Sequence, residues 1–145
     1  MKILISYRTV LFTLFLIGNI VKSQKKVDNS KLLNLWEFKK IDFSNYTYIY
    51  KRLENFDEKK SSIRFKKKGK SFAHLIKRGC GTGIIEDIRN NTLEFENVTG
   101  TWKKTSDTMI TIKTSENGTL DGTFIILKLT DDELILRRNI KWNKK

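Results

Sequence analysis

The stretch that decides the fold runs from Asn90 to Asn139 and reads NNTLEFENVTGTWKKTSDTMITIKTSENGTLDGTFIILKLTDDELILRRN. Its short segments alternate apolar and polar residues, and Asn, Gly, Asp or Ser separates one segment from the next. Between Thr92 and Glu96, for example, Leu93 and Phe95 fall on one face of a pleated strand and the two glutamates on the other. The stretch therefore predicts an antiparallel meander of short strands.

The residues before this stretch continue the pattern. Ser30 is placed to cap a single helical turn, and residues 53–61, which are charged and lack a strand period, predict a loop. Gly69 lies in a short connection where a tight hairpin requires a positive φ. The three glycines of residues 79–83 predict a sharp bend. Further strands are predicted at residues 35–41, 46–50, 62–66, 72–76 and 84–88.

These segments amount to about eight to ten strands, with no helix longer than a turn or two. Each strand has an apolar face, and no helix is available to cover it. Closure into a barrel covers these faces and removes the exposed strand edges. We therefore predict an all-β, antiparallel up-and-down meander that closes into a barrel, with a two-sheet sandwich as the alternative.

The first 23 residues are predicted to be a secretory signal peptide. Lys2 and Arg8 accompany an apolar core at residues 10–17, and Val21 and Ser23 suit the −3 and −1 positions of a cleavage site. The apolar run is shorter than the roughly 18 residues of a membrane-spanning helix, although an uncleaved anchor is the alternative. Residues 24–32 are predicted to be a flexible basic lead-in and residues 33–142 a single barrel domain, periplasmic or secreted.

The chain is strongly basic, with 29 lysines and arginines, 16 acidic residues and a net charge of +13. Cleavage after Ser23 would remove three basic and no acidic residues, which leaves a net charge of +10. The single cysteine, Cys80, excludes an internal disulfide, so packing must stabilise the domain. The single histidine, His74, excludes any site that needs two.

Trp36 and the segment Gly100-Thr101-Trp102 resemble the small secreted lipocalin-like proteins of bacteria. The similarity covers roughly residues 33–139 and includes the FIIL strand, the DDEL turn and a last strand that ends in arginines. The resemblance implies a barrel in which Arg137 or Arg138 packs across Trp36. It also implies a small apolar ligand inside the barrel. Asn34 stands where lipocalins have the glycine of their Gly-x-Trp motif.

The chain has more aromatic residues than the core of a narrow barrel needs, which predicts a ligand cavity lined by rings with a few polar tips. His74 is predicted to face the core or this cavity rather than to act in catalysis. The alternative is that the rings simply fill the barrel. The predicted lining consists of Trp36, Phe38, Tyr46, Tyr48, Tyr50, Phe65, Phe72, His74, Phe95, Trp102 and Phe124.

No enzyme, metal site or cofactor is predicted. A Cys80–His74 pair would need hydrogen-bonding contact and a third group that orients the base, so a small hydrolase is the least favoured reading. Glu86 and Asp87 are neighbours and would point to opposite faces of a strand. Residues 131–133 lack the alternating ligands of a calcium loop.

Four lysines, Lys66, Lys67, Lys68 and Lys70, cluster at a predicted hairpin tip and are expected to attract anions. Sequence-specific nucleic-acid binding is not predicted, because no recognition helix is visible. The alternative is a merely solvated face whose lysines reflect coding bias.

The first functional prediction is an exported, monomeric, non-enzymatic protein that holds a small apolar or amphipathic molecule in its barrel. The alternative prediction is an interaction module with a packed interior, whose basic surface binds an anionic envelope component, either a lipid head group or a polysaccharide.

Overall fold

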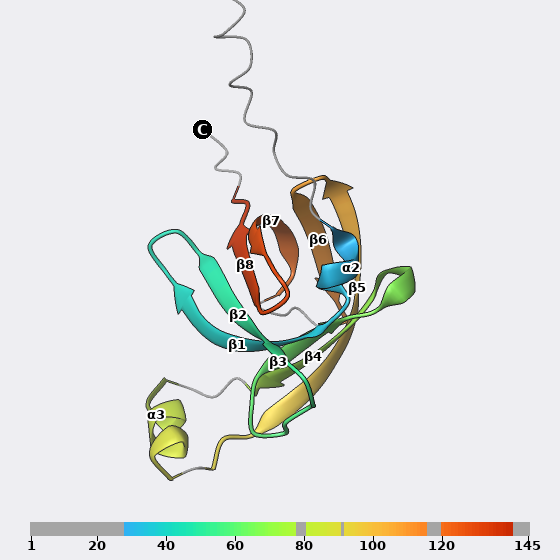
Figure 1. The fold of residues 1–145 in the computed structure, drawn as a ribbon. Coiled ribbons are helices and arrows are strands. Elements are labelled where there is room, and N and C mark those ends of the chain that lie inside the picture. The colour runs from blue at the N-terminus through green and yellow to red at the C-terminus, as the bar shows by residue number, and fades with distance from the viewer. Residues whose placement is uncertain (1–27, 78–80, 91, 116–119, 141–145) are drawn as a thin grey trace, which may run out of the picture.

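The computed structural model describes residues 28–77, 81–90, 92–115 and 120–140. It confirms the predicted all-β fold, because eight antiparallel strands close into a barrel (Figure 1). The predicted signal peptide, residues 24–27 of the predicted lead-in, Cys80 and the residues after 140 lie outside the described part of the chain.

The chain enters the barrel through the short helix α2 (Asn29–Leu32), and a 3₁₀ turn, η1 (Lys67–Gly69), connects the third and fourth strands. A longer helix, α3 (Gly81–Asn90), separates the fourth and fifth strands. The strands are β1 (Leu35–Asp42), β2 (Thr47–Leu53), β3 (Ser62–Phe65), β4 (Lys70–Ile76), β5 (Phe95–Ser106), β6 (Met109–Thr114), β7 (Gly122–Leu129) and β8 (Glu133–Arg138).

The strand order contains one departure from a simple up-and-down meander. Strands β3 to β8 follow one another around the barrel as predicted, but the β1–β2 hairpin is inserted between β3 and β8. Strand β1 pairs with β3, and β2 pairs with β8. The connection of residues 54–61 therefore crosses the end of β1, a step of two strand spacings, ~9.6 Å.

Alternate residues of the strands fill the interior. Trp36, Phe65 and Phe124 are the largest fully buried side chains, and aliphatic residues of β3, β6 and β8 surround them. Helix α2 adds Leu32 to this core, and its carbonyl accepts a hydrogen bond of 3.0 Å from the Trp36 indole Nε1. Full burial of each such apolar side chain contributes roughly 1.5–3 kcal/mol to folding.

The predicted strand at residues 84–88 is wrong, because these residues belong to helix α3. The three isoleucines of the segment Ile84-Ile85-Glu86-Asp87-Ile88 also fit a helical repeat, since positions i, i+1 and i+4 share one side of a helix. Ile85 and Ile88 are exposed. Figure 1 shows α3 beyond the ends of β4 and β5, on the side of the molecule away from α2. Among the described residues, neither helix has the length and apolarity needed to cross a bilayer.

The expected packing of a last-strand arginine across Trp36 is also wrong. Trp36 pairs with Arg52 on β2, whereas Arg137 pairs with Thr47. These two positions on β2 are five residues apart, roughly 17 Å in a strand. Arg138 instead places its guanidinium 5.1 Å from the centre of the Phe124 ring.

Two predicted turns can be checked directly. Gly69 adopts the positive φ expected of it, 71°, and a Cβ there would lie 2.7 Å from the Trp102 carbonyl oxygen. The helical turn near Ser30 is present, but its N-cap is Asp28, whose carboxylate accepts from the Ser30 amide at 2.9 Å. Both features are local, which is why the sequence indicated them.

Candidate functional site

The residues predicted to line a ligand cavity divide between the two faces of the barrel. Trp36, Tyr48, Tyr50, Phe65 and Phe124 are buried in the interior, and Phe38 and Trp102 pack against that core. Ala73 and Val98 pair across β4 and β5 and both belong to the core, so their strand neighbours point outward. The residues that the structure places outside the barrel are Phe72, His74 and Phe95, together with Tyr46, which is exposed in the β1–β2 turn.

The interior rings contact one another. The Tyr48 ring meets Phe124 edge to face with 5.7 Å between centroids, and Phe38 meets Tyr50 at the same distance. Burial raises the pKa of the Tyr50 phenol well above its ordinary value, with a further increase from Tyr48 and a smaller opposing effect of Arg138. The phenol is therefore neutral at physiological pH, and the Arg138 guanidinium, 5.1 Å from the centre of the Phe124 ring, lies near this aromatic part of the interior.

His74 is buried on the outer face, beneath the connection between β2 and β3. Its Nδ1 lies 2.7 Å from Asn97 Oδ1, and its Nε2 lies 2.9 Å from the Glu58 carbonyl oxygen. The Phe95 ring stacks on the imidazole at 4.8 Å, and the Phe56 ring approaches edge-on at 5.0 Å. His74 therefore fixes the β2–β3 connection against the barrel. The expectation that it faces the interior is wrong, because this connection covers the outer face there.

The hypothesis of a Cys80–His74 pair falls on a residue outside the described part of the chain. Both ring nitrogens of His74 already lie within hydrogen-bonding distance of oxygen atoms of Asn97 and Glu58. Within the described ranges, no three His, Cys, Asp or Glu side chains gather in a way that would hold a metal ion.

The candidate site is an open groove of about 540 Å³ on the outer face of the barrel, which we call the basic groove. It extends across β4, β5 and β6 and reaches the end of β3. None of its ten lining residues is acidic. The lining consists of Lys66, Lys70, Ser71, Phe72, Thr99, Gly100, Thr101, Lys113, Thr114 and Ser115.

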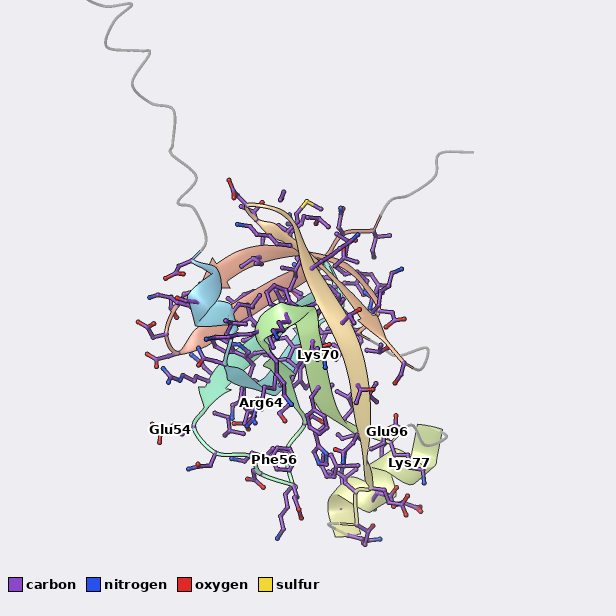
Figure 2. All side chains as sticks on the ribbon, turned by 90° about the vertical axis from the view of Figure 1, so that its right-hand side faces the viewer. Glu54, Phe56, Arg64, Lys70, Lys77 and Glu96 are labelled. Atoms are coloured by element: carbon purple, nitrogen blue, oxygen red, sulfur yellow. The ribbon has the colours of Figure 1, made fainter. Side chains whose placement is uncertain are left out.

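The sheet register arranges these side chains in two parallel rows. The Lys66 amide donates to the Lys70 carbonyl, Lys70 pairs with Thr101, and Thr101 pairs with Lys113. We call Lys66, Lys70, Thr101 and Lys113 the lysine row. The second row consists of Arg64, Phe72, Thr99 and Ser115. In Figure 2, Lys70 lies above Arg64, and Phe56 lies below both.

The lysines of this row differ from many others in the chain because they form no ion pair with a described carboxylate. Among the described residues, Lys66, Lys70 and Lys113 have no carboxylate within ion-pairing distance. The Lys66 ammonium lies 6.0 Å from the centre of the Phe72 ring instead. The lysines that do form ion pairs are Lys31, Lys39, Lys51, Lys60, Lys77, Lys104 and Lys128. The positive charge of the row is therefore not neutralised by described neighbours.

Two of the four lysines in the cluster predicted from the sequence line this groove. Lys66 and Lys70 line the groove, whereas Lys67 and Lys68 are exposed in the adjacent turn η1. Lys113 was not predicted from the sequence, because a residue of β6 comes near β4 only through the pairing of β5 with both strands. The alternation of side chains along a strand was the available signal in the sequence. If Ile112 points into the barrel, its neighbour Lys113 must point outward.

Gly100, one of the lining residues, lies where β5 comes very close to β6. A Cβ at this position would lie 2.4 Å from the Lys113 carbonyl oxygen and 3.0 Å from Ser71 Oγ. Real side chains do not tolerate such a distance, so glycine allows β5 to approach β6 closely here.

Comparisons with protein-family models, with curated proteins and with solved structures find no match for this chain. The resemblance to lipocalin-like proteins therefore remains a prediction from the sequence. The observations that can carry a functional assignment are those of the basic groove. Its row of lysines has no ion pair with any described residue, hydroxyl groups lie between and beside them, and an aromatic ring lies next to them.

Proposed function

We propose that this protein is a non-enzymatic binding module that holds an anionic ligand in the basic groove. The observation that carries the proposal is the lysine row, in which Lys66, Lys70 and Lys113 face the same groove without an ion pair to any described residue. A cleft lined by charge of one sign raises the local concentration of the opposite sign and accelerates association.

The packing of the barrel interior favours a ligand that binds to the outer face. An eight-stranded barrel is just wide enough for its own side chains or for one small guest. Here Trp36, Phe65 and Phe124 occupy that space with no exposure above 1%. The contacts between the interior rings favour a barrel whose main role is to present its outer face.

The proposal includes export of a monomeric protein. Residues 1–23 have the composition of a signal peptide, and outside the cytoplasm the abundant polyanions are polysaccharides and lipid head groups. The net charge of +10 that cleavage after Ser23 would leave favours adsorption to such material.

Retention on an immobilised sulfated polymer tests the proposal. The groove variant carries Lys66→Gln, Lys70→Gln and Lys113→Gln. A matched control carries Lys40→Gln, Lys59→Gln and Arg137→Gln, three exposed cations outside the groove. Both variants lose three charges, so net charge alone would make them elute at the same salt concentration. We expect the groove variant to elute at clearly lower salt. Equal elution of the two variants contradicts the proposal.

A small amphipathic ligand inside the barrel is the second candidate. One observation favours it: the phenol of Tyr50 is influenced electrostatically by both Tyr48 and Arg138, so two phenols and a guanidinium share one region of the interior. Native mass spectrometry of protein isolated from its own source tests this candidate. A retained small molecule that is absent from a Tyr48→Trp variant supports it, and an apo mass for the wild-type protein contradicts it.

A further inference from the structure

We infer that the ligand of the basic groove is an acidic polysaccharide, a chain of sugar units that carry carboxylate or sulfate groups, and that it lies across strands β3 to β6. The inference rests on the proposed function of the groove and names the class of anion that the groove selects.

The lysine row is too long for a single small anion. Lys66 directly follows β3, and Lys70, Thr101 and Lys113 lie on the next three strands. With neighbouring strands ~4.8 Å apart, the row is roughly 14 Å long, and its lysines are separated by about one and about two strand spacings. A single small anion cannot contact both ends of such a row. A polymer with repeated charges can contact all three ammonium groups.

Hydroxyl groups lie between and beside the cations of the groove. Thr101 separates Lys70 from Lys113 within the lysine row, and Thr99 and Ser115 continue the second row. These three residues are exposed. A hydroxyl both donates and accepts hydrogen bonds, which suits the hydroxyl groups that a sugar chain carries between its charged substituents.

A single aromatic ring, that of Phe72, lines the groove. Phe72 is half-buried in the groove, with the Lys66 ammonium over its ring and the Phe56 ring at its edge, 6.4 Å away. One ring beside a cation suits the apolar face of one sugar unit that carries an anionic group. Single-stranded nucleic acids are instead bound on successive aromatic residues that stack successive bases. The groove lining contains only one aromatic residue, Phe72.

The position of the exposed apolar residues argues against a lipid surface. Proteins that bind a bilayer insert large apolar side chains next to their basic residues. None of the exposed large apolar residues of the described chain lines the basic groove. These residues are Phe43, Tyr46, Phe56, Ile76, Ile85, Ile88 and Leu127.

The experiment measures binding of the full chain to five probes by titration at fixed ionic strength. The probes are a sulfated oligosaccharide, an oligogalacturonate, a neutral glucan of equal length, a single-stranded oligothymidylate, and vesicles that contain anionic phospholipid. We expect the tightest binding for one of the two acidic oligosaccharides, and the comparison of these two identifies the anionic group. The neutral glucan should not bind measurably.

Two variants test the sugar contacts without a change in charge. Phe72→Leu removes the ring but keeps an apolar side chain, and Thr101→Val removes an exposed hydroxyl with a residue that strands accept. We expect Phe72→Leu to raise the Kd for the acidic oligosaccharide by about tenfold, a change of about 1.4 kcal/mol. Thr101→Val should raise this Kd less, and neither variant should change vesicle binding. Circular dichroism and thermal unfolding establish that both variants fold.

The outcomes separate this inference from the proposed function. Tighter binding of oligothymidylate or vesicles than of both acidic oligosaccharides, or unchanged oligosaccharide binding in Phe72→Leu and Thr101→Val, overturns the polysaccharide inference and leaves the anion groove intact. Equal binding of every anionic probe by the wild-type protein and the Lys66, Lys70 and Lys113 variant overturns the proposed function as well.

Discussion

His74 and Asn97 face each other across β4 and β5 on the outer surface of the barrel, with 2.7 Å between Nδ1 and Oδ1. The opposite ring nitrogen of His74 lies 2.9 Å from the Glu58 carbonyl oxygen. The imidazole of His74 thus links Asn97 of the sheet to the β2–β3 connection, which is distant from it in sequence. The same connection carries Phe56, whose ring reaches Phe72 in the basic groove.

Substitution of His74 should destabilise the protein and loosen the β2–β3 connection. His74→Ala removes two buried hydrogen-bonding contacts and the stack on Phe95, and we expect a loss of about 2 kcal/mol in the free energy of unfolding. Urea unfolding measures the loss, and limited proteolysis should show faster cleavage between residues 54 and 61. Asn97→Ala is the control, because it keeps the contact with Glu58 and should cost about half as much. Unchanged stability in His74→Ala contradicts the assigned role.

The η1 turn provides a pair of opposite backbone predictions. Gly69→Ala places a Cβ at a φ of 71° and 2.7 Å from the Trp102 carbonyl oxygen, so we expect a loss of about 1–3 kcal/mol. Lys68 has a φ of 60° without being glycine. Lys68→Gly should therefore be neutral or stabilise the protein by up to about 1 kcal/mol. Thermal unfolding of both variants checks the prediction, and two shifts of the same sign and size would contradict it.

The indole hydrogen bonds of Trp36 and Trp102 should contribute different amounts to the free energy of unfolding. Trp36 Nε1 donates to the Leu32 carbonyl in a fully buried setting, whereas Trp102 Nε1 donates to the Lys66 carbonyl near the surface, each at 3.0 Å. Trp36→Phe removes this buried hydrogen bond and part of a fully buried ring, although the Leu32 carbonyl still accepts from the Asn34 amide at 2.7 Å, so we expect a cost of about 1–3 kcal/mol. Trp102→Phe should cost less, because water replaces the lost donor. Equilibrium unfolding in urea compares the two, and equal costs would refute the difference in burial as the cause.

Glu133 should contribute stability at neutral pH that is lost in acid. Hydrogen bonds from the Lys128 and Lys51 ammonium groups hold the pKa of this carboxyl below its ordinary value. A folded-state pKa below the unfolded-state pKa means that the contribution is present above the unfolded-state value and disappears as the pH falls through the folded-state value. Glu133→Gln should therefore be less stable than the wild type at pH 7, and the difference should shrink as the pH falls below 4.5, the ordinary value for glutamate.

The control for this prediction is Glu54→Gln, since Glu54 is exposed and has no ion pair among the described residues. Unfolding curves at pH 7 and pH 3 should show no pH-dependent difference between this variant and the wild type. A stability difference for Glu133→Gln that is as large at pH 3 as at pH 7 would show that ionisation is not the cause.

The sequence by itself determined the strand segments and most of the turns. The alternation of residues 109–114, which form β6 with Ile110 and Ile112 buried, or the positive φ of Gly69, depends only on neighbouring residues and on the geometry of one strand or one turn. The same local rules predicted that closure into a barrel would cover the apolar faces, and the closed sheet confirms it. They failed at residues 84–88, because a short segment with three isoleucines fits both a strand and a helix.

Only the tertiary structure decided which strands are neighbours and which face is covered from outside. The β1–β2 hairpin pairs with β3 and β8, which separates Trp36 from Arg137 and excludes the expected contact between them. His74 is buried under a connection rather than in the core, since alternation identifies two faces but not what lies over each. The lysine row likewise exists only because four strands align in register, and pairing between strands is a long-range property that no local pattern specifies.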